Sequence, residues 1–168
     1  MTMAPRLRKF ALTAHVTSSV GWLGAVGCFL ALAVAGLTSR DPQVVRASYL
    51  AMDVTARFVI VPLALAALAT GLVQSLGTTW GLFRHYWVLI KFLVTIVATV
   101  VLLQQLEPIT YVAGVAAETT LSRADLHQAR TSLVAHAGGG LLVLLVPTTL
   151  SVYKPRGLTR YGQRKQLA

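Results

Sequence analysis

Apolar residues fill four long stretches of the sequence, and short polar segments separate them. The first stretch runs from Phe10 to Leu37 without a single Asp, Glu, Lys or Arg. About twenty consecutive apolar residues suffice for a helix to cross the hydrocarbon layer of a bilayer. The pattern therefore predicts four transmembrane helices, at about residues 10–37, 43–76, 82–106 and 123–153.

Polar turns and prolines predict where these helices end or bend. Residues 38–42 and 77–81 are typical of tight turns, and residues 107–122 predict a loop. Pro62 is expected to kink the second helix, because proline lacks a backbone N–H donor. Short connections favour antiparallel neighbours, so we expect one all-α domain over residues 1–168, an up-down-up-down four-helix transmembrane bundle.

The composition agrees with lipid as the solvent of this chain. Of its 168 residues, 55% are hydrophobic and only 12% are charged. Soluble domains carry about twice that charged fraction, roughly a quarter of their residues. The chain is therefore predicted to be a multi-pass membrane protein.

The net charge of +10 is distributed unevenly along the chain. Most Lys and Arg residues fall on the predicted side that carries both termini, whereas all five acidic residues fall on the other. This asymmetry predicts that both termini are cytoplasmic in a bacterial cytoplasmic (inner) membrane. The basic tail, residues 154–168, is expected to contact anionic headgroups. No nucleic-acid-binding motif accompanies the charge, so we expect no nucleic-acid partner.

Ionisable side chains inside the predicted spans are candidate functional residues, because they are costly in hydrocarbon. His15 shares a helix face with Ser18, Ser19 and Trp22 by the three-four-seven spacing. One interpretation is a histidine hydrogen-bonded to a neighbouring helix. The other is a ligand of a metal ion or a haem iron, since neutral imidazole is the commonest metal ligand among side chains.

Lys91 is predicted at a depth close to that of His15, on a polar helix stripe that includes Arg84. It either snorkels to the cytoplasmic headgroups or supplies positive charge to haem propionates or an anionic substrate, with a further role as a proton donor. His85 lies off this stripe. It is either a plain interfacial histidine or a second ligand below His15.

His136 lies in the predicted fourth helix, with Gly140 one turn further on the same face. A glycine beside a histidine leaves a flat slot that a porphyrin ring could fill. Equally, the run Gly138–Gly140 could let two helices approach closely, as could Gly21 with Ala25 and Gly24 with Cys28. His15 and His136 are candidate metal ligands that we expect in opposite leaflets.

Asp53 and Arg57 are spaced to pair on one helix face. We expect this ion pair near the outer surface of the membrane.

Three segments together carry a resemblance to known proteins: His15–Gly24, Thr70-Gly71-Leu72 and Tyr86–Lys91. They resemble an uncharacterised family of small bacterial four-helix integral membrane proteins, and the likeness covers most of residues 8–153. More distantly, the chain is similar to the copper-resistance D-type membrane domains and to the small four-helix membrane protoporphyrinogen oxidases. Those proteins share a helix-one histidine followed by Trp and Gly, and a lysine on helix three. The resemblance to the oxidases implies that His15 binds haem b and that Lys91 is a catalytic residue.

Together these features predict an inner-membrane protein that binds haem b and takes part in redox chemistry or electron transfer. Trp22, Arg84, His85, His136 and Gly140 are the further candidate cofactor-binding residues. A membrane redox partner or a second copy of the chain is the expected partner. The alternatives are a non-enzymatic membrane subunit, a small transporter, or a protein that handles copper or another metal. No phosphate-binding loop, zinc-protease motif or serine nucleophile elbow occurs in the sequence.

Overall fold

The structure is a computed structural model that describes residues 3–77, 81–118, 127–155 and 157–167. The described part of the chain is helical and contains no β-strand. Its elements in chain order are α1 (Pro5–Thr38), α2 (Pro42–Thr55), the π-helical segment η1 (Ala56–Ile60), α3 (Val61–Gly77), α4 (Tyr86–Ala117), α5 (His127–Tyr153) and α6 (Arg160–Leu167). Because α2, η1 and α3 follow one another without a break, this part of the chain has four helices long and apolar enough to cross a membrane.

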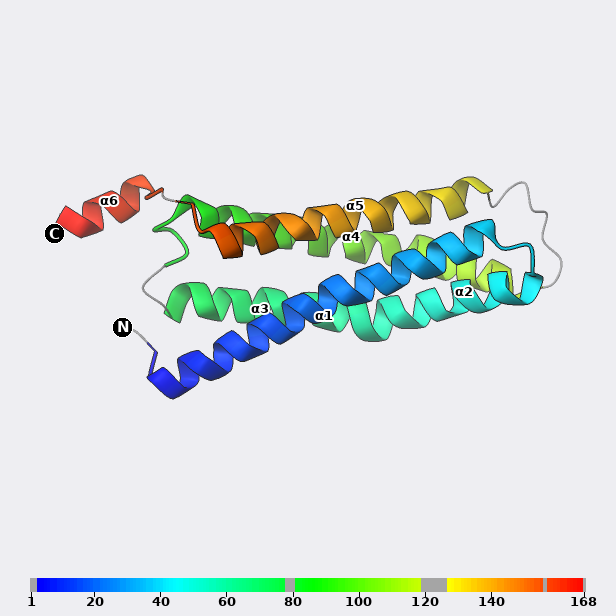
Figure 1. Ribbon diagram of the computed structural model, residues 1–168, viewed down its shortest axis with the longest axis horizontal. Coiled ribbons are helices and arrows are strands. Elements are labelled where there is room, and N and C mark those ends of the chain that lie inside the picture. The colour runs from blue at the N-terminus through cyan, green and yellow to red at the C-terminus, as the bar shows by residue number, and fades with distance from the viewer. Residues whose placement is uncertain (1–2, 78–80, 119–126, 156, 168) are drawn as a thin grey trace.

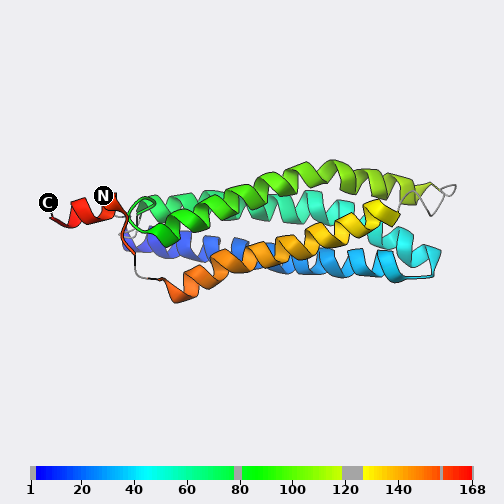
Figure 2. The same cartoon turned by 90° about the horizontal axis from the view of Figure 1, so that it is seen from above.

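The four long helices lie side by side along the longest axis of the molecule (Figure 1). The connection between α1 and α2 lies at one end, and both termini lie at the other. Helix α1 packs against α2, α3 and α5, and α4 packs against the same three helices. Figure 2 shows the same arrangement from above, with α6 extending beyond the bundle at the end that carries the termini. The all-α antiparallel four-helix bundle is therefore confirmed.

The third long helix differs from its predicted bounds at both ends. Residues 82–84 form a turn after Gly81, whose φ of +58° suits glycine. His85 is the extended N-cap residue, and α4 begins at Tyr86. The loop predicted from residue 107 is wrong for residues 107–117, which continue α4 with Pro108 inside it. Ile109, Val112 and Ala113 bury one face of this extension, and that burial keeps the segment helical. Residues 78–80 of the predicted turn, residues 119–122 of the loop and the expected start of the fourth helix at residue 123 lie outside the described residues.

The prediction for Pro62 is refined by η1, the π-helical segment that directly precedes it. The N–H of Val61 donates to the carbonyl of Ala56, five residues earlier. In a regular α-helix the Pro62 ring would crowd the carbonyl of Phe58, and no N–H would reach that oxygen. The wider turn of η1 relieves this crowding. Around Pro62 the hydrogen-bond pattern therefore changes from α-helical to π-helical, and the helix continues to Gly77.

Most of the molecular surface along the bundle is apolar. Large side chains such as Phe10, Phe58 and Val152 are more than 70% exposed, and they belong to a long series of exposed hydrophobic residues on all four helices. The core between the helices contains Met52, Ile60 and Val112 as its largest fully buried side chains. Soluble proteins rarely expose contiguous apolar surface of this extent, so the bundle has the exterior of a lipid-facing protein.

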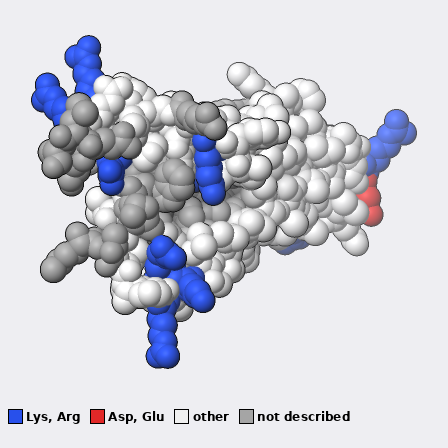
Figure 3. All heavy atoms as spheres, turned by 60° about the vertical axis from the view of Figure 1, so that its left-hand side comes forward, with Lys and Arg blue, Asp and Glu red and all other residues white. Residues whose placement is uncertain are grey.

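Lys and Arg side chains gather at the end of the bundle that carries the termini, and the acidic side chains visible in Figure 3 lie at the opposite end. The segment after α5 contributes to this basic end and packs against the turn before α4. Thr159 donates its N–H to the carbonyl of Arg84 at 3.0 Å, and Tyr86 donates to the carbonyl of Gly157 at 3.4 Å. The basic tail is thus joined to the bundle through its first residues and ends in the short helix α6.

Arg130 connects three helices at the end opposite the termini. Its Nε donates to the Tyr49 hydroxyl at 2.8 Å, and its Nη2 donates to the carbonyl of Gly36. Gly36 lies in the last turn of α1, where carbonyls lack partners within the helix. Arg130 therefore satisfies one of these carbonyls and holds α1, α2 and α5 together.

Candidate functional site

A cavity of about 700 Å³ lies between α1, α3, α4 and α5 near the end that carries both termini. Four basic side chains line it, namely Arg8 and Lys9 from α1, Lys91 from α4 and Lys154 from just beyond α5. His15 also lines it, and much of the remaining wall is apolar. Among the described residues that line this cavity, none is Asp or Glu. We call it the basic cavity.

His15 is half-buried, and a hydrogen bond to α3 fixes its ring. Its Nδ1 lies 3.1 Å from Thr70 Oγ1. The Thr70 hydroxyl lies 2.6 Å from the carbonyl of Ala66, which can only accept, so the hydroxyl hydrogen is used there. Thr70 Oγ1 therefore accepts from Nδ1–H, and in this neutral tautomer Nε2 carries the lone pair. The backbone of Ala67 is a further hydrogen-bond partner of the ring. The neutral ring is the form of histidine that ligates a metal ion, with its other nitrogen oriented by a neighbour.

Gly71 provides the space that the His15 ring occupies. A Cβ atom added to Gly71 would lie 3.1 Å from Cε1 of His15, closer than ordinary van der Waals contact. Thr70 and Gly71 therefore position His15 together, one through a hydrogen bond and the other through the absence of a side chain. Both belong to the segments that carry the family resemblance, but the sequence alone gives no sign that they contact His15.

Lys91 lines the basic cavity with His15, so the structure brings together the two residues predicted to lie at similar depth. Its Nζ lies 5.5 Å from the centroid of the Trp87 ring, within the range of a cation–π interaction. Trp87 is buried and also lines the cavity. The ring therefore holds the ammonium group at the cavity wall.

Two candidate residues of the same region do not line the basic cavity. His85 is the residue before the first turn of α4, and its backbone pairs with Leu158 of the tail. Its ring lies 6.3 Å from the Trp87 ring, centroid to centroid. Arg84 lies in the turn that receives the tail, where its carbonyl accepts from Thr159. The structure therefore does not place His85 or Arg84 in the cavity that contains His15.

Trp22, His136 and Gly140 line a second cavity, of about 380 Å³, between α1, η1, α4 and α5. Trp22 lies on the predicted face of α1, but seven residues beyond His15, which is about 10 Å along the helix axis at 1.5 Å per residue. It therefore lines the next cavity along the bundle and not the basic cavity. We call the second one the glycine cavity, after Gly139 and Gly140 in its wall.

The glycines of α5 face open space. No atom outside the helix backbone lies within 4 Å of a Cβ added to Gly138, Gly139 or Gly140. The close helix approach considered for this run is therefore wrong, because no neighbouring helix reaches these glycines, and His136 and Gly139 are exposed at the surface of the bundle. The same holds for Gly24, whereas a Cβ at Gly21 would meet the Leu63 side chain at 3.3 Å.

His15 and His136 line separate cavities, so they do not form one metal site. Nδ1 of His136 lies 2.7 Å from the carbonyl of Ser132, which leaves Nε2 as its free nitrogen. In the described part of the chain, no group of three or more His, Cys, Asp or Glu side chains is placed to hold a metal ion. A metal ion at either histidine would therefore need other ligands than such side chains. The iron of a porphyrin has them, because the ring supplies four nitrogen ligands.

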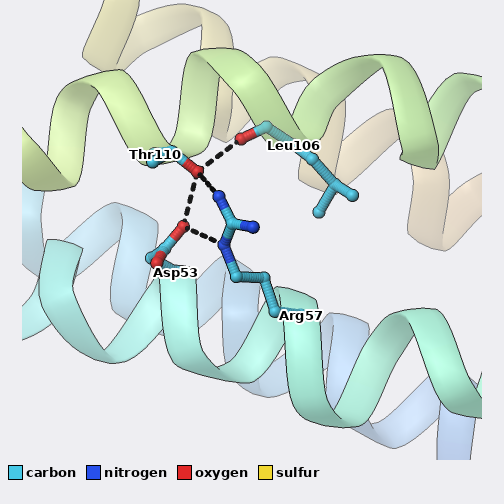
Figure 4. Close-up of polar contacts among 4 residues, drawn as sticks. All are labelled: Asp53, Arg57, Leu106 and Thr110. Carbon is cyan, nitrogen blue, oxygen red and sulfur yellow. Dashed lines mark hydrogen bonds and ion pairs between the residues drawn. The ribbon is translucent and has the colours of Figure 1, made fainter.

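The predicted pair of Asp53 and Arg57 is confirmed, with Nε of Arg57 3.0 Å from Oδ1 of Asp53. Thr110 of α4 joins it (Figure 4). The Thr110 hydroxyl lies 2.7 Å from Oδ1 of Asp53 and 2.9 Å from the carbonyl of Leu106, and Nη2 of Arg57 donates to its oxygen. The pair therefore links α2 and η1 to the extension of α4 that the sequence pattern does not predict.

Replacing Arg57 by Ala is expected to lower the free energy of unfolding by about 1 kcal/mol, because the pair is partly exposed and one charged hydrogen-bond network is lost. The loss should be smaller in an Asp53→Asn background, where no unpaired carboxylate remains. Unfolding by sodium dodecyl sulfate, followed by circular dichroism in mixed micelles, measures both values. Equal losses in the two backgrounds would show that the pair contributes no coupling.

Comparisons of the chain with protein-family models, with curated proteins and with solved structures found no match. The resemblance to the four-helix family, the copper-resistance domains and the protoporphyrinogen oxidases therefore stays a prediction.

Proposed function

We propose that this protein is a multi-pass protein of the bacterial cytoplasmic membrane that binds b-type haem in the basic cavity and takes part in electron transfer or redox chemistry. The observation that carries the proposal is the placement of the His15 ring in the basic cavity. The ring is oriented by Thr70 so that Nε2 carries the lone pair, and it lies in a cavity that joins an apolar wall to four basic side chains.

The membrane assignment is supported by the length and apolarity of the four helices and by their exposed hydrophobic surface. The orientation is supported by charge, because basic residues concentrate at the end that carries both termini. The positive-inside rule then assigns this end to the cytoplasm.

A reporter fused after Lys165 is expected to read as cytoplasmic, and one fused after Glu118, where α4 ends, as external. Paired alkaline phosphatase and fluorescent-protein fusions measure the two positions independently. A cytoplasmic signal from the Glu118 fusion would reverse the proposed orientation.

The residues of the basic cavity suit haem b. His15 would ligate the iron, and the apolar wall, including Val16, Leu68 and Phe92, would contact the porphyrin faces. The basic side chains would meet the two propionates, as charge-assisted contacts of a carboxylate require. A bound haem supplies a one-electron couple, whose potential the protein sets through the axial ligand, local charge and burial.

Lys91 is the residue we propose to act next to the haem or its substrate. Its ammonium is held over Trp87 and lines the same cavity as His15, so it can neutralise a carboxylate or transfer a proton at Nζ.

The visible spectrum of the detergent-purified protein, before and after dithionite, tests the proposal. We expect a Soret band and the reduced α-band of a b-type haem in protein made with ample haem supply. Colourless protein under that condition would contradict haem binding, and the reading as a non-enzymatic membrane subunit would replace it.

A further inference from the structure

The glycine cavity has no role in the function proposed above, and its chemistry differs from that of the basic cavity. None of the described residues that line it is Asp, Glu, Lys or Arg. Its wall is apolar and includes the aromatic rings of Trp22 and Phe29. An anionic or cationic headgroup would therefore lose its hydration in this cavity without gaining a partner. The site suits an uncharged, apolar ligand.

The polar side chains of the wall lie toward the end of the bundle opposite the termini. Gln105 lies in the second half of α4, and His136 lies in the first half of the antiparallel α5. At 1.5 Å per residue, a hydrocarbon layer of about 30 Å that begins at Tyr153 ends near Leu133. His136, three residues further along the helix, would then lie about 4.5 Å inside the far boundary. A ligand here would have its polar group near one membrane surface and its apolar part toward the bilayer centre.

Two further properties narrow the ligand class. Nδ1–H of His136 is used by the carbonyl of Ser132, so Nε2 can accept a hydrogen bond from a ligand hydroxyl. The amide of Gln105 can both donate to a ligand carbonyl and accept from a hydroxyl. In addition, Gly139 and Gly140 carry no side chain, so this part of the wall is flat, and it opens to the exterior beside the exposed Gly139 and His136. A flat ring that carries carbonyl or hydroxyl oxygens matches these features better than a plain acyl chain, which needs no hydrogen bonds.

We propose that the glycine cavity binds the head ring of a lipid-soluble quinone or quinol. Its volume of about 380 Å³ lies in the lower part of the range of ligand cavities, which suits one ring and the start of its chain. The proposal does not depend on haem at His15, because it uses other residues in another cavity. It does rest on the proposal that the protein spans a membrane, because the ligand would enter the cavity from the lipid.

The test uses the full chain in lipid nanodiscs and decylubiquinone as the probe. Quinones quench tryptophan emission, and Trp22 lies in the cavity wall. Saturable quenching is expected, and Trp22→Phe should remove the part of the signal that reports this cavity.

Gly140→Leu and Gly24→Leu are matched variants, because both glycines lie in long helices and have open space for a Cβ, but only Gly140 lines the cavity. Gly140→Leu is expected to weaken binding by at least about tenfold, because it fills the slot, and Gly24→Leu should bind as the parent does. Equal binding by the two variants would overturn the proposal.

His136 variants test the polar end of the cavity and remain informative if Gly140→Leu does not fold. His136→Leu is expected to weaken binding by about tenfold, and His136→Gln, which keeps a hydrogen-bonding group, by less. Decylbenzene, which lacks the ring oxygens, should not compete with the quinone. Competition by decylbenzene at the same concentration would identify a groove for acyl chains and contradict the quinone assignment. Quinone binding by protein that shows no Soret band would support the quinone proposal even where the haem proposal fails.

Discussion

His15→Ala is expected to remove the Soret band of the purified protein, while the protein still inserts and purifies. The imidazole is the metal-ligating side chain proposed for the basic cavity, and alanine offers no replacement ligand. The packing of the bundle should survive the change, because the His15 ring contacts α3 through hydrogen bonds to Thr70 and to the backbone of Ala67 and through the space beside Gly71, and not through a large apolar contact. A visible spectrum with a pyridine haemochrome assay measures the haem content of both proteins.

Thr70→Val is the matched control for the orientation of the ring. Valine keeps the shape of threonine but removes the oxygen that accepts from Nδ1–H. Loss of such an outer partner typically lowers metal affinity by about 10- to 100-fold, so haem should bind more weakly without being abolished. A normal haem content in His15→Ala would exclude His15 as the ligand. An unchanged affinity in Thr70→Val would exclude the orienting role of Thr70.

Variants of Lys91 and His85 distinguish the effect of a nearby charge on the haem from the effect of a second iron ligand. Lys91→Met should leave haem bound but change its reduction potential, because a cation of the cavity wall is removed, and Lys91→Arg should be milder. His85→Ala should leave the coordination unchanged, since His85 does not line the basic cavity. Loss of a six-coordinate low-spin spectrum in His85→Ala would show that the turn before α4 supplies the second axial ligand.

The features of this chain that follow a short, regular spacing could be predicted from the sequence. The four apolar stretches predict the four long helices, and the separation of Asp53 and Arg57 by four residues predicts their ion pair. The similar depth of His15 and Lys91 follows from their distance from the basic end, and the structure adds that both line one cavity. Each of these predictions needs only the rise and period of one helix and the knowledge that neighbours are antiparallel.

Features that depend on the rotation of one helix against another could not be predicted in this way. No periodicity indicates that Thr70 of α3 contacts His15, or which residues of α4 and α5 face Trp22 across the glycine cavity. The continuation of the helix past Glu107 could not be predicted either, because Pro108 normally indicates that a helix ends. Burial of Ile109 and Val112 offsets the free-energy cost of placing this proline inside the helix. Whether any of the candidate residues binds a cofactor stays a prediction.

Gly36→Ala is expected to destabilise the bundle by about 1–3 kcal/mol, the range of overpacking in a well-packed interior. A Cβ at this position would lie 2.8 Å from Cζ of Tyr49, which is 2% exposed. The ring cannot simply move away, because Arg130 bonds its hydroxyl at 2.8 Å and lies over its face at 5.3 Å from the centroid. The added methyl must therefore displace the tyrosine, the arginine and the α1 carbonyl that the arginine satisfies.

Gly24→Ala is the matched control, because Gly24 lies in the same helix and a Cβ there meets no atom within 4 Å. It should be neutral or slightly stabilising, since alanine is the better helix former. In a Tyr49→Leu background, Gly36→Ala should cost much less than in the parent, because the ring that it displaces is absent. Unfolding by sodium dodecyl sulfate in mixed micelles gives the free energies of unfolding of the parent, of Gly36→Ala, Gly24→Ala and Tyr49→Leu, and of the double variant. If Gly36→Ala proves as stable as Gly24→Ala, α1 and α2 do not approach at Gly36 as closely as the Tyr49 contact requires.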